Sequence, residues 1–215
     1  MKKTILLLVI TALFIGCTKE DDVDQDSSST PGTPVAIQAI DITSASFTAM
    51  WKEAANAKSY EIDLAKDSYF NMIVKTVKSN TTSVGFLSID DNTRYYYRVR
   101  AVNGDKVSPN SNAINVFTLP EPPMALAATS ITNSGFTVNW NWAPSITSYL
   151  LYISTEDFPH DASKNLPAYN GKTVVSNTHG VTGLNSNTTY YYVLRSANGN
   201  YISANSNTIS CKTLN

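Results

Sequence analysis

The residues best suited to chemistry are few and lie in separate parts of the chain. Besides two cysteines there are two histidines, His160 and His179. His160 lies in the segment 156–161 among three carboxylates, and such a group could bind a hard or borderline cation. Its spacing matches no known ligand pattern, however. We therefore interpret the segment as a solvated loop and predict no metal site.

No catalytic residue is predicted either. The sequence has no nucleophile elbow, phosphate-binding loop or paired zinc-ligand motif. A glycosidase of the two-carboxylate kind needs acids that face each other across a cleft, whereas the acids of the C-terminal repeat all lie in one loop, at Glu156, Asp157 and Asp161. We therefore expect a non-enzyme without a cofactor, in which His179 is partly buried on a strand and Cys211 is a buried free thiol.

Length and charge set wider limits. The chain has 215 residues, of which 42% are hydrophobic and 15% charged, and its formal net charge is -1. Such a chain is too apolar to be disordered, and it is long enough for one large domain or two of roughly 100 residues. Strong electrostatic capture of nucleic acid needs clustered Lys and Arg, so we exclude nucleic acid as a partner.

Residues 1–16 have the form of a secretory signal peptide. Two lysines precede an apolar run over residues 5–15, which is too short for a lasting membrane span. The Gly-Cys pair that follows resembles the lipobox of bacterial lipoproteins, although Phe14 departs from the usual Leu. The resemblance implies that Cys17 is acylated and anchors the mature chain in a lipid bilayer. Secretion without lipid, with a free thiol at Cys17, is the alternative.

Residues 17–33 are expected to form a flexible, acidic tether that begins at the lipidated cysteine. They hold little apolar surface to bury, and they contain four more acidic than basic residues, the single basic residue being Lys19. The start of this segment resembles the export signal that sends some Gram-negative lipoproteins to the outer face of the outer membrane. We predict a lipid-anchored outer-membrane protein exposed at the cell surface, with the periplasmic face as the alternative.

The rest of the chain contains the same unit twice. Residues 34–51 match residues 123–140 at an offset of 89, and residues 95–119 match residues 190–214 at an offset of 95. The second copy has therefore gained six residues between its third and fifth strands. A repeat of this length indicates a duplicated domain rather than a solenoid unit of about 20 to 50 residues.

Within each copy the apolar residues recur with a period of two. Phe47, Ala49 and Trp51, for example, alternate with Thr48 and Met50. This spacing predicts half-buried strands with polar turns between them, and no segment shows sustained helical periodicity. About seven short strands in each copy are typical of an antiparallel sandwich.

Aromatic residues at fixed places in both copies resemble those of the fibronectin type III domain. They are Trp51, Tyr60 and Tyr95 in the first copy and Trp140, Tyr149 and Tyr190 in the second. The resemblance implies that Tyr95 and Tyr190 each form a tyrosine corner, whose hydroxyl bonds the backbone a few residues upstream.

The same resemblance covers residues 34–215 and implies an all-β fold of two tandem immunoglobulin-like sandwiches. Domain one is expected at residues 34–119 and domain two at residues 124–215. The proline-rich linker between them, residues 120–123, favours an extended geometry, so the pair should stand as a semi-rigid rod.

The two copies differ on the outward face of their third and sixth strands. Domain one carries Glu61 and Asp63 opposite Arg98 and Arg100, which is suited to cross-strand pairing in water. We expect plain solvated surface there.

Domain two instead carries an apolar and aromatic cluster on this face, which usually marks a contact site. The candidate ligand or protein contacts are Leu150, Tyr152, Tyr191, Val193, Arg195 and Trp142. The cluster could stack on the apolar face of a sugar. Alternatively, the domain's own loop at 157–172, with Phe158, Leu166 and Tyr169, could cover it.

These features predict a non-catalytic surface lipoprotein that acts in binding or adhesion, with surface glycan capture as one role. Its partners would be the lipid bilayer, through acylated Cys17, and a polysaccharide. The alternative is a structural spacer or subunit of an outer-membrane assembly, which would use the same face of domain two to bind an envelope protein.

Overall fold

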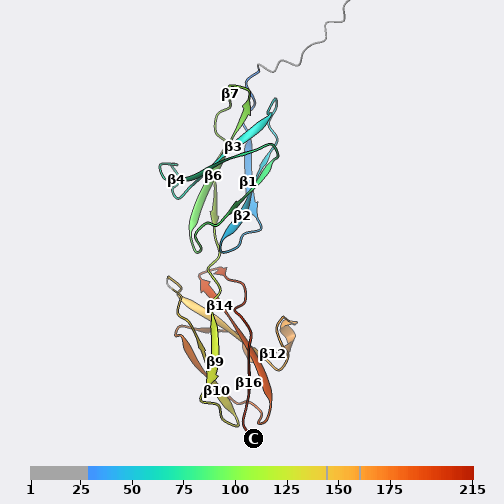
Figure 1. The fold of residues 1–215 in the computed structure, drawn as a ribbon, viewed down its shortest axis with the longest axis vertical. Coiled ribbons are helices and arrows are strands. Elements are labelled where there is room, and N and C mark those ends of the chain that lie inside the picture. The colour runs from blue at the N-terminus through green and yellow to red at the C-terminus, as the bar shows by residue number, and fades with distance from the viewer. Residues whose placement is uncertain (1–28, 144, 160) are drawn as a thin grey trace, which may run out of the picture.

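The computed structural model describes residues 29–143, 145–159 and 161–215, which form two β-sandwiches in succession (Figure 1). Domain one pairs β1-β2-β5 in one sheet and β4-β3-β6-β7 in the other, where β8 also pairs with β6. All its strand pairs are antiparallel. Its strands are β1 (Val35–Ile40), β2 (Ser46–Lys52), β3 (Ser59–Ala65), β4 (Ile73–Ser79), β5 (Ser83–Leu87), β6 (Arg94–Asn103), β7 (Lys106–Val107) and β8 (Ile114–Phe117).

Domain two repeats this topology, with sheets β13-β10-β9 and β12-β11-β14-β15, where β16 also pairs with β14. The predicted all-β fold of two tandem sandwiches is confirmed. Among the described residues no helix is long and apolar enough to cross a membrane. The elements are β9 (Ala125–Thr129), β10 (Gly135–Trp140), β11 (Ser148–Ser154), a 3-10 turn η1 (Ala162–Lys164), β12 (Asn165–Val174), β13 (Thr178–Thr182), β14 (Thr189–Asn198), β15 (Tyr201–Ile202) and β16 (Ile209–Lys212).

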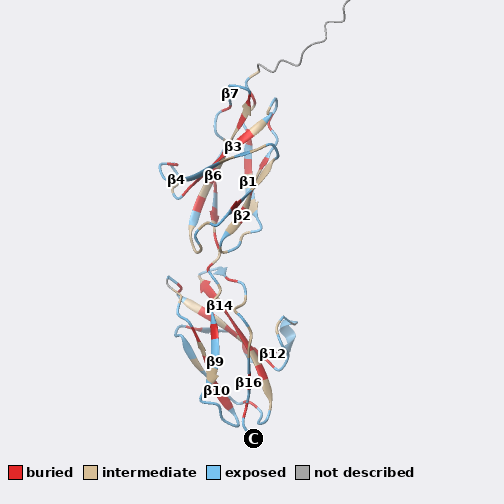
Figure 2. Cartoon of the chain, in the orientation of Figure 1, coloured by how far each residue is buried: buried red, intermediate tan, exposed pale blue. Residues whose placement is uncertain are grey.

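In the central strands β2, β6 and β10 the period-two pattern places one side of the strand in a core between the two sheets, which appears as alternating buried segments in Figure 2. In domain one the indole of Trp51 packs edge-on against Tyr60, with ring centroids 5.4 Å apart. In domain two the same edge-on contact joins Trp140 and Tyr149 at 5.5 Å. The two cores therefore share their aromatic packing as well as their topology.

A tyrosine of the sixth strand crosses each core to reach the opposite sheet. The Tyr97 hydroxyl donates to the carbonyl of Ile37, and the Tyr192 hydroxyl donates to the carbonyl of Leu126. Each acceptor lies beside a register shift in the first strand of its domain, where the strand's own hydrogen-bond ladder is broken. A phenol is long enough to satisfy a carbonyl at such a bulge while its ring stays in the core.

Both predicted tyrosine corners have the expected hydrogen bonds. The Tyr95 hydroxyl accepts from the backbone N–H of Asp90 at 3.0 Å, and the Tyr190 hydroxyl accepts from that of Asn185 at 3.0 Å. Both partners lie five residues upstream, in the crossover between the two sheets. The buried tyrosine thus supplies a partner for an amide that the sheets leave free.

The outward face of domain one is not the plain solvated surface expected from the sequence. The predicted cross-strand ion pairs are present, but Asp63 is only 2% exposed. Its carboxylate accepts from Thr76 Oγ1 at 2.8 Å, Arg98 Nε at 3.1 Å and Arg100 Nη1 at 2.7 Å. The Phe70 ring lies 4.3 Å from the Arg98 guanidinium and helps to cover the group. A buried ion network therefore replaces a surface pair.

The two domains also touch directly at their junction. The rings of Phe117 and Tyr201 stack with centroids 4.2 Å apart. The Asn92 side chain accepts from Asn198 Nδ2 at 2.8 Å and donates to the Ser145 carbonyl at 3.4 Å. Contacts in addition to the proline-rich linker therefore hold domain two against domain one.

We expect Tyr95→Phe to lower the free energy of unfolding of domain one by about 1 kcal/mol, because the substitution leaves the partly buried N–H of Asp90 without its acceptor. Urea denaturation of the two-domain chain measures this. Tyr69→Phe is the matched control, since Tyr69 is 83% exposed. Equal stability of the two variants would contradict a stabilising role of the corner.

Acid should weaken domain one through Asp63. Burial alone would raise the pKa of this carboxyl, but the hydrogen bonds from Thr76, Arg100 and Arg98 and the positive charge of Arg100 together hold the pKa below its usual value. The ionised group therefore stabilises the fold above the unfolded-state pKa of about 4, and this contribution is lost as the pH falls through the lowered folded-state pKa.

Asp63→Asn should be less stable than the wild type at pH 7 and should lose less further stability between about pH 5 and pH 2. Thermal unfolding across this range gives the comparison. The exposed Asp105→Asn serves as the control and should follow the wild-type profile. An acid response of Asp63→Asn as steep as that of the wild type would contradict the assignment.

Candidate functional site

Four of the six predicted contact residues lie half-buried on the outward face of β11 and β14 in domain two. Tyr152 and Arg195 line a common hollow, whereas Leu150 and Tyr191 stand beside it. Leu150 pairs with Arg195 across the two strands, and Tyr191 pairs with Ser154. The face is thus partly covered, as the second of the two interpretations of the sequence expected.

The other two residues are placed differently. Val193 is only 1% exposed, so its prediction as a contact residue is wrong. Trp142 is 54% exposed, but it follows β10 and its ring lies edge-on to Tyr149 with centroids 5.9 Å apart. Trp142 does not line the hollow that Tyr152 and Arg195 share.

The six extra residues of domain two are shared between a loop and a strand. The connection from β11 runs over residues 155–164, whereas its counterpart in domain one runs over residues 66–72. In addition, β12 has ten residues and β4 has seven. In Figure 1 the inserted connection stands out from the body of domain two beside β12.

The predicted covering loop at 157–172 is therefore only partly correct. Phe158 and its neighbours do lie over the outward face. Leu166 and Tyr169, however, belong to β12 and pack against the inner core. The Tyr169 hydroxyl accepts from the backbone N–H of Thr182 at 3.2 Å. The strand β12, which pairs with β11, therefore begins earlier in the segment 157–172 than the sequence indicated.

Between the inserted connection and the sheet lies a hollow of about 410 Å³. One wall comes from the inserted connection and the other from the sheet with its edge strand. The hollow is lined by Tyr152, Phe158, Pro159, Ala162, Asn165, Asn170, Arg195 and Asn205. It therefore combines aromatic rings, three amides and one guanidinium, which suits a small polar ligand with an apolar face.

The Tyr152 ring can lie close to β12 because a glycine faces it. Gly171 has φ +80°, a conformation that L side chains rarely adopt, and a Cβ there would lie 3.3 Å from the Tyr152 hydroxyl. The register between β11 and β12 also shifts next to Tyr152. This bulge and its glycine give one aromatic wall of the hollow its position.

The amides of the hollow are only partly used within the protein. Asn165 Nδ2 donates to Asn170 Oδ1 at 2.9 Å. Asn165 is 9% exposed, and its Oδ1 atom has no hydrogen-bond partner among the described residues. Because a buried amide oxygen without a partner is costly, a donor from a ligand would be favoured at this point.

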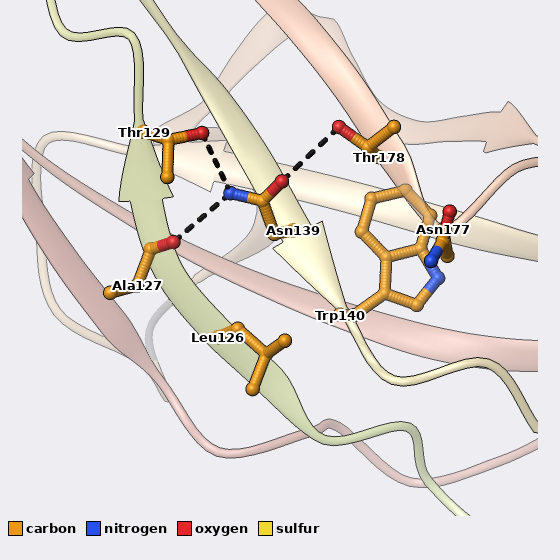
Figure 3. Close-up of a pocket in the computed structure, with 7 residues that line it drawn as sticks. All are labelled: Leu126, Ala127, Thr129, Asn139, Trp140, Asn177 and Thr178. Carbon is orange, nitrogen blue, oxygen red and sulfur yellow. Dashed lines mark hydrogen bonds between the residues drawn. The ribbon is translucent and has the colours of Figure 1, made fainter.

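A second hollow, of about 510 Å³, lies on the opposite sheet over β9, β10 and β13 (Figure 3). At its centre the Asn139 amide donates to the Ala127 carbonyl and to Thr129 Oγ1, both at 3.1 Å, and accepts from Thr178 Oγ1 at 3.2 Å. The Asn139 amide replaces ladder hydrogen bonds that are missing at the β9 bulge. Its donors and its acceptor are therefore already bonded within the protein.

The Trp140 indole N–H in the second hollow has no partner in the described part of the chain, but the same is true of Trp51 in domain one. The unpaired N–H is therefore a property shared by the two sandwiches rather than a mark of this groove. The hollow around Tyr152 and Arg195 is the better candidate site.

The remaining chemically capable residues lie apart from that site. His179 is half-buried on β13, as predicted, and its pKa is lowered by burial and by the positive charge of Lys172. Cys211 is free and buried, and burial raises the pKa of its thiol. His160 and Cys17 lie outside the described residues, so their roles stay predictions. The described residues contain no group of three metal-ligating side chains.

Sequence reasoning missed the three asparagines of the hollow, Asn165, Asn170 and Asn205. The chain is rich in asparagine, so their residue type carried no signal. The pairing of β11 with β12 brings Asn165 and Asn170 to the site. The hydrogen bond from Arg195 Nε to Asn205 Oδ1, at 2.6 Å, brings in the third.

Comparisons with curated proteins find two animal relatives. The chain is 25% identical over 127 residues to "Phosphatidylinositol phosphatase PTPRQ" from Homo sapiens, which covers 56% of this chain and 5% of that protein. It is 32% identical over 126 residues to "MAM and fibronectin type III domain-containing protein 1" from Acropora millepora, which covers 53% of this chain and 30% of that protein. The chain thus spans less than a third of either relative.

Solved structures with two or more similar domains also match. A two-domain fibronectin type III segment of chicken tenascin has a TM-score of 0.49 at 20% identity, covering 84% of this chain and 99% of that one. The FN1–FN3 domains of chicken CNTN1 have a TM-score of 0.43 at 15% identity, covering 87% and 69%.

The family described as "Fibronectin type III domain" matches residues 32–117 and again residues 121–212. Each match contains the strands of one sandwich together with its cross-core tyrosine and its tyrosine corner. The chain belongs to the fibronectin type III family, with two copies of the domain in tandem.

Proposed function

We propose that this protein is a non-catalytic, lipid-anchored lipoprotein of the bacterial outer membrane that binds a ligand at the cell surface through domain two. Fibronectin type III domains generally serve as binding or spacer modules. The signal-like segment 1–16, the following Cys17 and the acidic residues after it support lipid anchoring. Glycan capture is the binding role that the candidate site favours.

The observation that carries the binding proposal is the difference between the two outward faces. In domain one a buried carboxylate and two arginines close the face. In domain two the corresponding face has a hollow with an aromatic ring, Tyr152, and a partly satisfied amide, Asn165. Ring faces stack on the apolar face of a sugar while amides bond its hydroxyls.

A spacer role is the second candidate, and the junction between the domains favours it. The stack of Phe117 on Tyr201 and the hydrogen bonds of Asn92 connect the two sandwiches directly. A stiff pair of domains could hold another envelope protein at a set distance from the membrane, with the face around Leu150 and Tyr191 as the interface.

Lipid anchoring predicts that Cys17→Ser abolishes incorporation of labelled palmitate and releases the protein from the membrane fraction. Protease treatment of intact cells should degrade the wild-type body. Protection of the body until the outer membrane is broken would place it on the periplasmic face, whereas membrane retention of Cys17→Ser would contradict the lipid anchor.

Glycan binding predicts that the soluble chain, residues 18–215, is retarded in native gels that contain its polysaccharide. Tyr152→Ala should weaken this binding about 10- to 100-fold, because the stacking surface is lost. Tyr69→Ala, on the exposed surface of domain one, should bind as the wild type does. Normal migration across a broad polysaccharide panel, together with co-purification of another envelope protein, would favour the spacer instead.

A further inference from the structure

The repeat pairs Arg195 of domain two with Arg100 of domain one, and the surroundings of these two arginines differ. Arg100 Nη2 lies 2.8 Å from a carboxylate oxygen of Glu61, and its Nη1 lies 2.7 Å from one of Asp63. Two acids on the neighbouring strand therefore neutralise the guanidinium. Both terminal nitrogens of Arg100 are thus paired with carboxylates and are not available to bind an anionic ligand.

In domain two both acids are replaced by uncharged residues. The strand β11 places Leu150 and Tyr152 beside Arg195, where domain one has Glu61 and Asp63. Among the described residues, none of the ion pairs includes Arg195. The half-buried guanidinium of Arg195 is therefore not neutralised, whereas the equivalent Arg100 is paired with two carboxylates.

The contacts that Arg195 does make hold it in place without neutralising it. Its Nε donates to Asn205 Oδ1 at 2.6 Å, and its guanidinium carbon lies 5.1 Å from the centre of the Tyr152 ring. Within the described part of the chain, its two terminal nitrogens have no hydrogen-bond acceptor. A planar guanidinium fixed through Nε and stacked on a ring is preorganised to bind a carboxylate.

The acids of domain two do not line the hollow. Glu156 is paired with Lys164 at 3.3 Å. Asp161 accepts from the backbone N–H of Ser163 at 2.9 Å, at the start of η1. Asp157 is exposed on the inserted connection. Among the residues that the structure describes, the positive charge inside the hollow therefore has no counterion, and an anion is the complementary ligand.

We propose that this hollow binds a sugar residue that carries a carboxylate, such as a hexuronic acid within a polysaccharide. The carboxylate would bind the two terminal nitrogens of Arg195, while hydroxyls of the same ring bond the amides of Asn165 and Asn170. The inference rests on the proposed glycan-binding function and specifies its ligand. Three amides and a stacking ring favour a polyhydroxylated acid over an acidic peptide.

The test uses the soluble chain, residues 18–215, and three polymers at about 150 mM salt. Polygalacturonate offers the carboxylate, methyl-esterified polygalacturonate offers the same backbone with the charge removed, and poly-L-glutamate offers the charge without a sugar. Calorimetric titration should show binding of the first polymer and at least about tenfold weaker binding of the other two.

Two variants examine the role of the guanidinium. Arg195→Gln should reduce affinity for polygalacturonate about 10- to 100-fold. Lys212→Gln removes the same charge from the exposed side of β16 and should bind as the wild type does. Asn205→Asp places a carboxylate beside Arg195 Nε, so it should reproduce the loss while leaving the arginine present. Thermal unfolding establishes that each variant is folded.

Equal binding of the free acid and the methyl ester would overturn the carboxylate inference and leave glycan binding standing. Equal binding of poly-L-glutamate would overturn the sugar as the ligand class. Polygalacturonate binding that survives both Arg195→Gln and Asn205→Asp would remove Arg195 from the site. If neither uronate polymer is bound, the inference fails, and the broader polysaccharide panel then decides whether glycan binding itself fails.

Discussion

Each sandwich depends on one long polar contact through an otherwise apolar core. The tyrosines of the sixth strand, Tyr97 and Tyr192, reach the backbone of the opposite sheet where its first strand bulges. A partly buried carbonyl that loses its ladder partner needs another donor, and the tyrosine hydroxyl that crosses the core provides it. This contact ties the register of one sheet to the bulge of the other.

With both cores constrained in the same way, the outward faces are free to differ. Domain one fills its face with charge, and the buried carboxylate of Asp63 is stable there because two arginines and Thr76 surround it. Domain two has lost the acids and kept one arginine, and a longer connection stands over it. A closed surface and a ligand-sized hollow thus arise on the same framework from a few substitutions and an insertion.

Much of this framework could be predicted from the sequence, because burial follows local periodicity. The alternation around Trp51 and the spacing of the corner tyrosine Tyr95 indicated the strands and the crossover directly. The burial of Asp63 and Val193 could not be predicted in this way. It depends on which side chains from other strands and loops lie over them, and Leu166 and Tyr169 likewise depend on how far strand pairing extends.

The junction between the domains adds a consequence for ligand capture. Because Asn92 bonds both the end of β14 and the loop before β11, and Phe117 stacks on Tyr201, rotation of one sandwich relative to the other would break several contacts at once. The direction in which the hollow of domain two faces is then fixed relative to domain one. All copies of the protein would then open their hollows at the same angle from domain one.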